Sequence, residues 1–190
     1  MQNNYLDSVK KQFLFNKNLG DKSFDQIPEE GIHWQYNEAS NSIAIIVKHM
    51  AGNMLSRWTN FLTEDGEKEW RKRDEEFEDT YSSKEEMLAD WEKGWNCLFD
   101  GLNSLKPEDL EAIIYIRNEG HTVIEAINRQ LSHYSYHTGQ IVYIARMISS
   151  DEWQSLSIPK GTSKEYNKEK FGEEKGRRHY TDEYLPSKED

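Results

Sequence analysis

Two histidines, His133 and His137, are four residues apart in a stretch whose apolar spacing is typical of an α-helix. Side chains at positions i and i+4 of a helix lie on one face, one turn apart, so both imidazoles can reach one metal ion. A third ligand must come from another element. His49 is the candidate, because it lies on a polar line within an otherwise apolar helical segment, where a polar side chain needs a partner. Three inward imidazoles would leave coordination positions open, which is typical of a catalytic metal site.

An alternative interpretation of these histidines stays open. An HxxxH pair arises by chance in many helices, and a single inward histidine such as His49 is often a hydrogen-bonded core residue. The remaining histidines are His33 in a connector, His121 at a helix start and His179 in the C-terminal tail. Surface or capping roles fit these three positions best.

Other patterns that could support chemistry are absent or incomplete. The sequence has no glycine-rich phosphate loop and no HExxH zinc motif. Residues 74–85 place oxygens at several positions of a calcium loop, but the turn position that requires glycine holds Asp79. Cys97 has no adjacent histidine and lies beside an apolar helical face, so we interpret it as a small buried hydrophobic residue.

Four segments with the apolar spacing of amphipathic helices would position these side chains. We expect helices over residues 4–19, 43–62, 83–105 and 122–148. The expected N-caps are Asn41 or Ser42 for the second helix, Ser83 for the third and Thr122 for the last. A β-branched run over 112–117 predicts a brief extended segment before the last helix.

The predicted fold class is all-α, a four-helix bundle over residues 1–150. We expect residues 151–190 to form a C-terminal extension that is partly packed on the bundle or flexible, with little helix over 160–190. A charged insert over 67–81 separates the second and third helices. Between residues 64 and 92 there are thirteen acids and five bases, and the ordinary interpretation of such a run is a solvated loop.

The charge balance and composition exclude several partner classes. The 190 residues include 35 acids and 24 Lys or Arg, giving a net charge of −11. Such a surface repels phosphate backbones, so we expect no nucleic-acid partner. The longest apolar run, residues 43–47, is too short to span a bilayer, and the start of the chain lacks a signal-peptide pattern. A single cysteine excludes an internal disulfide, so we expect a cytoplasmic protein without a membrane partner.

Three segments resemble the DinB/YfiT-like superfamily of metal-dependent enzymes, and within it a bacterial branch described as a domain of unknown function. The segments are NSIAIIVKHMAGNMLSRWTNFLTEDGEKEWRKRDEEFE, HYSYHTGQIVYIARM and SLSIPKGTSKEYN, between residues 41 and 167. The resemblance implies a four-helix bundle whose second and last helices supply a metal site at His49, His133 and His137. It also implies a divalent ion, typically nickel, zinc or similar.

Relatives of known activity in that superfamily are thiol-dependent transferases and an isomerase, in which the metal activates a low-molecular-weight thiol. Many relatives form dimers. The resemblance therefore implies a small-molecule substrate and a homodimer. The long charged insert and the tail depart from those relatives, so their thiol-transferase activity does not carry over directly.

The insert offers charged residues that would act only if it folds over the site. Arg71 or Arg73 could then pair with a substrate carboxylate, and Asp74 or Glu76 could serve as a general base. In the alternative, Arg73 and Arg57 pair with acids of the insert to hold it in place. Those acids are Asp74, Glu76 and Glu78.

Two polar residues lie within a turn of the histidines on the same helices. Asn53 follows His49 and Gln140 follows His137, and either could orient a bound water or a ligand histidine.

Three hypotheses for function remain. In the first, a metal held by the three histidines lowers the pKa of a bound water or thiol, which attacks an electrophile. In the second, the chain is a metal-binding or stress-related module without turnover. In the third, a metal-free bundle acts through a dimer surface built from Trp91, Trp95 and Phe99, although their 3–4 spacing is also what a helical core needs.

Overall fold

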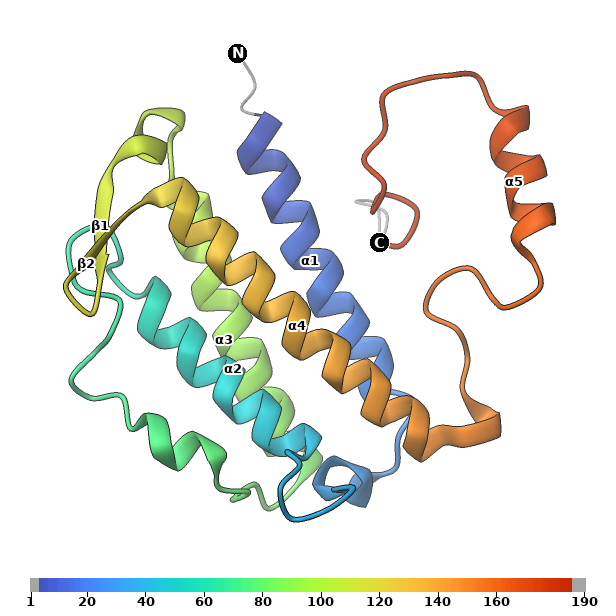
Figure 1. The fold of residues 1–190 in the computed structure, drawn as a ribbon, viewed down its shortest axis with the longest axis horizontal. Coiled ribbons are helices and arrows are strands. Elements are labelled where there is room, and N and C mark those ends of the chain that lie inside the picture. Colours follow the sequence, from blue (N-terminus) through green and yellow to red (C-terminus); the bar gives the residue numbers. More distant parts are fainter. Residues whose placement is uncertain (1–3, 186–190) are drawn as a thin grey trace.

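The computed structural model describes residues 4–185 and consists mostly of helices, with one small antiparallel hairpin (Figure 1). The α-helices are α1 (Asn4–Phe24), α2 (Ile43–Trp58), α3 (Lys84–Ser104), α4 (Val123–Ser149) and α5 (Ser163–Gly172). The strands are β1 (Ile113–Ile116) and β2 (Glu119–Thr122). Short 3₁₀ helices occupy Glu29–His33, Arg73–Phe77, Pro107–Glu111 and Ser150–Glu152.

The four long helices α1–α4 lie side by side and enclose one apolar core (Figure 1). Helix α2 packs against both α3 and α4, and α1 packs against α4. Trp95 of α3 is fully buried and meets Phe13 of α1 and Tyr134 of α4 edge-on. Trp91 is also buried, so the dimer surface hypothesised for the aromatic residues of the third helix is wrong for both tryptophans. Their 3–4 spacing fills the core.

The expected N-caps are confirmed. The side-chain oxygens of Ser42, Ser83 and Thr122 each accept a hydrogen bond from a backbone N–H three residues later, at 3.1–3.2 Å. These bonds satisfy donors that the helix itself leaves unpaired. The caps at Ser42 and Thr122 matter for function, because they set where α2 and α4 begin and therefore where their histidines lie around each helix.

Two helix ends differ from the prediction. Helix α1 continues to Phe24, because Phe24 is buried edge-on against Trp91 and this packing extends the helix. Helix α2 ends at Trp58 rather than at residue 62, since Asn60 adopts a left-handed φ of 49°, which asparagine tolerates and which stops the helix.

The extended segment predicted over 112–117 is present as β1, but the sequence prediction missed its partner β2. Arg117 and Asn118 have φ values of 56° and 62°, as a two-residue type I′ hairpin turn requires. The hairpin returns the chain to Thr122, where α4 starts.

The expectation of little helix in the tail is also wrong, since α5 spans ten residues there. It buries none of its residues, so no apolar periodicity marked it. Its contacts are polar instead: Tyr166 and Lys170 both bond to the carboxylate of Glu183.

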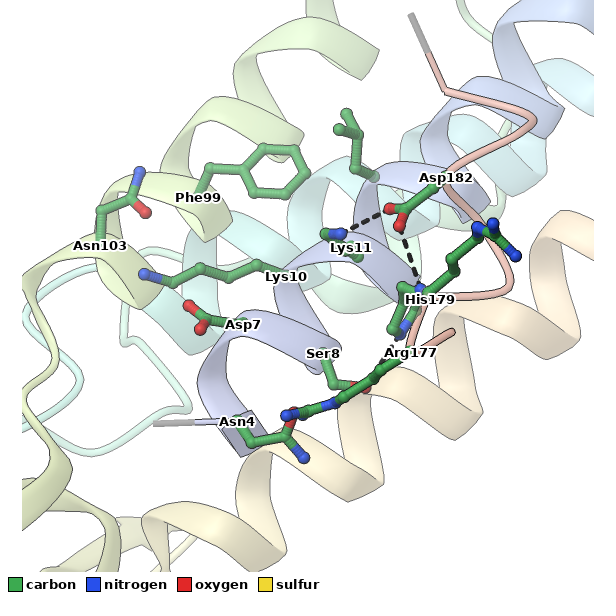
Figure 2. Close-up of a pocket in the computed structure, with 12 residues that line it drawn as sticks. Asn4, Asp7, Ser8, Lys10, Lys11, Phe99, Asn103, Arg177, His179 and Asp182 are labelled. Atoms are coloured by element: carbon green, nitrogen blue, oxygen red, sulfur yellow. Dashed lines mark hydrogen bonds and ion pairs between the residues drawn. The ribbon is translucent and has the colours of Figure 1, made fainter. Parts of the chain in front are cut away.

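The end of the described chain returns to α1 (Figures 1 and 2). His179 hydrogen-bonds Ser8 at 3.0 Å, and Asp182 pairs with Lys11. A hollow of about 780 Å³ lies beside these contacts, between α1, α3 and the tail. Within residues 4–185, no helix combines the length and the apolarity that crossing a membrane requires.

Candidate metal centre

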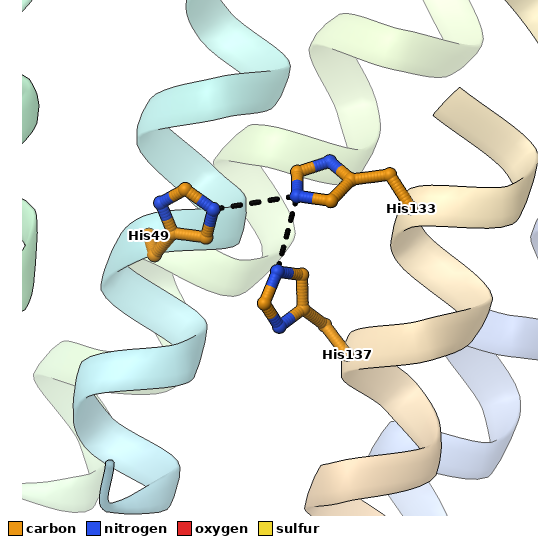
Figure 3. Close-up of side chains that lie close together, drawn as sticks. All are labelled: His49, His133 and His137. Carbon is orange, nitrogen blue, oxygen red and sulfur yellow. Dashed lines mark hydrogen bonds between the residues drawn. The ribbon is translucent and has the colours of Figure 1, made fainter. Parts of the chain in front are cut away.

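The three histidines selected from the sequence meet between α2 and α4 (Figure 3). The Nε2 atom of His133 lies 3.4 Å from Nε2 of His49 and 3.0 Å from Nε2 of His137. One nitrogen from each ring can be chosen so that all three lie within 4.8 Å of one another. His49 and His137 are buried and His133 is half-buried, so the cluster lies at the edge of the core.

The opposite ring nitrogens of two histidines are held by hydrogen-bond acceptors. Oε2 of Glu76 accepts from Nδ1 of His49 at 2.9 Å, and Oε1 of Gln140 accepts from Nδ1 of His137 at 2.8 Å. These acceptors keep the proton on Nδ1 and leave the Nε2 lone pair directed at the centre. Ligand histidines in metal sites are held in this way by outer hydrogen bonds.

The site disfavours protonated imidazoles. Burial, together with the neighbouring His137 and His49, lowers the pKa of His133 to about 3. Burial also lowers the pKa of His137. Metal ligation needs neutral imidazole, so these two rings are in the required state at neutral pH. Nitrogen lone pairs about 3 Å apart repel one another unless a proton or a cation lies between them.

The insert places a buried acid, Glu76, beside the outer ring nitrogen of His49. Both oxygens of Glu76 are bound by Arg71, whose Nε and Nη2 donate at 2.7 and 2.8 Å. The Arg71 side chain is only 2% exposed. Although burial alone raises the pKa of the Glu76 carboxyl, hydrogen bonds from His49 and Arg71 bring it below the usual range. Glu76 is therefore an anion that faces the outer nitrogen of His49.

Gly52 permits this approach. A Cβ atom at position 52 would lie 2.4 Å from Oε1 of Glu76, well inside van der Waals contact. Only glycine fits at this position. Helix α2 therefore carries a glycine in its interior, although glycine destabilises a helix relative to alanine.

The interpretation of the insert as a solvated loop is therefore wrong at Glu76, which is 6% exposed. Arg73 lies 3.8 Å from Asp74, one of its predicted partners, whereas the partners of Arg57 and Glu76 differ from the prediction. Arg57 donates to Glu67 and to the backbone oxygen of Gly66, and Arg71 rather than Arg73 pairs with Glu76. The periodicity-free sequence of the insert gave no sign of which arginine would be buried.

Two other predicted residues, Asp74 and Arg73, lie at the surface. Asp74 is fully exposed, and its carboxylate lies 3.8 Å from Arg73. The guanidinium of Arg73 lies 5.1 Å from the centre of the Phe77 ring. Arg71 has its guanidinium occupied by Glu76 and Glu67, which leaves it no free edge for a substrate carboxylate.

Asn53 and Gln140 support the centre in different ways. Gln140 holds His137 directly. The Oδ1 atom of Asn53 accepts from the hydroxyl of Tyr134 at 2.9 Å, and the Tyr134 ring packs beside His133. Asn53 thus contacts the site through a tyrosine and not through His49.

Two aromatic residues at the site were missed by the sequence prediction. Phe77 stacks on His49 with ring centres 5.0 Å apart, and Tyr136 lies 4.8 Å from His137. The Tyr136 hydroxyl also accepts from Nε2 of Gln140, at the i,i+4 spacing that could have identified it.

The other three histidines stay outside the centre, as predicted. His33 is exposed and bonds Asp79, His121 contacts Arg129 on the hairpin side, and His179 lies in the tail.

Comparison with known proteins gives a family but no characterised relative. Residues 1–162 match the sequence profile of a family described as "Protein of unknown function (DUF1572)". The match covers most of the chain, so the chain belongs to this family. No curated protein and no solved structure matches it. The matched region includes all three histidines and the insert.

Proposed function

We propose that this DUF1572 protein is a metal-dependent enzyme whose single divalent ion is held by His49, His133 and His137. The observation that carries the proposal is the convergence of three Nε2 atoms while two of the Nδ1 atoms are held by acceptors. Imidazole ligands suit nickel, zinc and similar ions. An ion held there would supply Lewis acidity and would lower the pKa of a water or small thiol, as a hydrolase or a thiol-dependent transferase requires.

A catalytic site is supported over a structural one by the number of ligands. Among residues 4–185, no fourth Cys, His, Asp or Glu joins the cluster. Structural zinc sites close all four positions with protein ligands, whereas catalytic sites keep one for water or substrate. The coordination left open here would receive the reacting molecule.

The surrounding residues orient the ligands and do not move protons in this proposal. Both oxygens of Glu76 are engaged by His49 and Arg71, so we assign Glu76 to holding His49 in its Nδ1–H form. Gln140 does the same for His137. Asp74 is too exposed to serve as a general base at this site.

The wider assignment is a four-helix bundle of the DinB-like type, acting on a small molecule in the cytoplasm as a homodimer. The side-by-side packing of α1–α4 and the placement of the ligands on α2 and α4 support the fold assignment. Light scattering on the full chain tests the dimer, and a strict monomer would contradict it.

Cobalt substitution tests the proposed open position. Co²⁺-loaded protein should develop a sulfur-to-cobalt charge-transfer band when cysteine or 2-mercaptoethanol is added, because a thiolate can enter the open position. His137→Ala should lose both the cobalt spectrum and the band while retaining the helical circular dichroism signal. A cobalt spectrum that no thiol, hydroxide or azide perturbs would contradict an open catalytic site.

That last outcome would favour a second function, a metal-binding module without turnover. The observation in its favour is the buried Arg71–Glu76–His49 chain, which ties the insert to α2 through a candidate metal ligand. A metal held there would brace the insert. Such a module would show metal-dependent stability without any ligand exchange at the ion.

A further inference from the structure

A groove next to the histidines differs in chemistry from the rest of this acidic chain. It has a volume of about 620 Å³, within the range of small-molecule sites. Its walls are the connector after the first 3₁₀ helix, the first turns of α2 and the C-terminal half of α4. The lining residues are Trp34, Tyr36, Ala39, Ser40, Asn41, Ile46, Gln140, Tyr143, Ile144 and Met147.

The groove has no charged residue among its ten lining residues, although charged residues make up 31% of the chain. Its apolar side chains are also unusually accessible: Tyr36 is 77% exposed, Tyr143 65% and Met147 39%. Exposed aromatic side chains grouped on a concave surface are typical of binding sites. A lining of this kind would strip water from a charged ligand without offering it a partner, so it selects an uncharged one.

The groove starts one helical turn from the candidate metal centre on both helices. Ile46 precedes His49 by three residues on α2, and Gln140 follows His137 by three residues on α4. Positions three apart lie on the same helical face. Gln140 belongs to both features, because it lines the groove and its Oε1 accepts from Nδ1 of His137.

The connector wall is held in shape by its own hydrogen bonds. Nε2 of Gln35 donates to the backbone oxygen of Ser40 at 2.9 Å, and Oδ1 of Asn37 accepts from the Ser40 hydroxyl at 2.8 Å. These bonds fix the backbone of the connector before a ligand arrives, which lowers the entropy lost on binding.

We propose that this groove binds the apolar body of the substrate, an uncharged small molecule with an aromatic or alkyl group, beside the histidine centre. This inference rests on the proposed function, since it assigns a substrate class to the same site. Trp34, Tyr143 and Met147 contact the apolar body, and Gln140 lies at the end nearest the metal ligands.

Two probes with one ring system test the ligand class. N-phenylnaphthylamine is uncharged, and anilinonaphthalene sulfonate adds a sulfonate to the same skeleton; both fluoresce more strongly in apolar sites. The zinc-loaded full chain should bind the uncharged probe about tenfold more tightly than the sulfonate. Equal or tighter binding of the sulfonate would overturn the assignment of an uncharged ligand.

A charge introduced into the groove tests whether the probe binds there. Tyr143→Glu should weaken binding of the uncharged probe by about tenfold or more, because the carboxylate must be desolvated. The matched control is Phe171→Glu on α5, where an 86% exposed aromatic residue receives the same change. Equal affinities in the two variants would place the probe elsewhere and overturn the inference.

Proximity to the metal is tested by comparing Co²⁺ and Zn²⁺ in nuclear magnetic resonance. Paramagnetic Co²⁺ should broaden or shift the proton resonances of the bound uncharged probe, whereas Zn²⁺ should not. An unchanged probe spectrum with bound Co²⁺ would overturn the link between the groove and the site.

A second copy of the chain is the other possible occupant of the groove. If the wild type bound no probe and formed a dimer that Tyr143→Glu dissociated, a second copy would occupy the groove and the inference would be overturned.

The groove and the metal function can fail separately. His133→Gln combined with His137→Gln removes two ligands and leaves every groove residue in place, so this variant should retain its affinity for the uncharged probe. If the wild-type chain bound the probe but took up no metal, the proposed function would be contradicted and the ligand class of the groove would still stand. If the wild-type chain bound metal but no probe, only the proposed role of the groove in substrate binding would be contradicted.

Discussion

The two helices that supply the histidines hold them in different ways. On α2, His49 is backed by a buried ion pair, Glu76 with Arg71, which reaches it from an insert 27 residues further along the chain. On α4, His137 is backed by the neutral, half-buried amide of Gln140 in the next turn of the same helix. One side thus depends on buried charge and long-range contact, and the other on local helix geometry.

This difference determines how substitutions beside each helix should affect stability and metal affinity. Removing one member of a buried ion pair strands the other charge in the core, which costs far more than losing an exposed polar contact. We therefore expect substitutions on the α2 side to reduce both stability and metal affinity. Substitutions of the same kind on the α4 side should act on the metal with little effect on the fold.

Replacing Glu76 should give the largest effect. Glu76→Ala leaves Arg71 buried with only a longer contact to Glu67, so we expect the free energy of unfolding to fall by about 3 kcal/mol. Metal affinity should fall by about 10–100-fold as His49 loses its acceptor. Urea denaturation and metal titration measure the two effects. The control is Glu75→Ala, an exposed neighbour, and equal stabilities of the two variants would contradict the buried role of Glu76.

Gly52→Ala tests the same contact without removing a charge. The new methyl group must displace Glu76, so we expect a loss of about 1–3 kcal/mol in the free energy of unfolding. Gly139 on α4 has open space around its Cβ position, and Gly139→Ala should instead stabilise the protein by about 0.5–1 kcal/mol. Thermal or urea unfolding of both variants gives the comparison. If Gly52→Ala also stabilised the protein, Glu76 would move aside without cost, and the close contact with Gly52 would be contradicted.

The depressed pKa of His133 predicts a pH dependence for the metal-free protein. The pKa of a histidine in the unfolded chain is about 6.5, whereas burial, His137 and His49 lower the pKa of His133 to about 3 in the folded chain. Between these values the unfolded chain binds a proton that the folded chain does not. Stability should therefore fall as the pH falls from about 6.5 towards 3. His133→Gln should flatten this slope in urea unfolding, and identical slopes would contradict the shift.

The smallest effect is expected at Gln140. Gln140→Ala removes a neutral acceptor at a half-buried position, so stability should change by no more than about 0.5 kcal/mol. Metal affinity should fall by less than in Glu76→Ala, because no charge is lost. Isothermal titration with zinc checks the order. A larger loss in Gln140→Ala than in Glu76→Ala would reverse the comparison between the two helices.

The sequence predicted the parts of the site that depend on helix geometry. The i,i+4 spacing of His133 and His137, the polar line through His49 and the N-caps of α2 and α4 all follow from local rules. These features placed the three histidines correctly on two neighbouring helices. Gln140 was found in the same way, as the residue one turn beyond a candidate ligand.

The insert could not be predicted, because its contacts do not follow a period. Nothing in its run of acids distinguishes buried Glu76 from exposed Asp74 or Glu75, since only the tertiary contact with His49 and Arg71 separates them. One signal was present: Gly52 interrupts a helix on the face of His49, and an interior glycine often marks a close approach by another group. Helix α5 was missed for a related reason, as its contacts are polar and leave no apolar stripe.

Metal content tests the central claim most directly. Full-length, tag-free protein purified without chelator should contain about one divalent ion per chain by mass spectrometry, because the histidines converge on one centre. His133→Gln combined with His137→Gln should carry none, while Glu75→Ala should match the wild type. An absence of bound metal in the wild type, even after incubation with nickel, zinc and manganese, would contradict the account and leave the histidines as polar residues of the core.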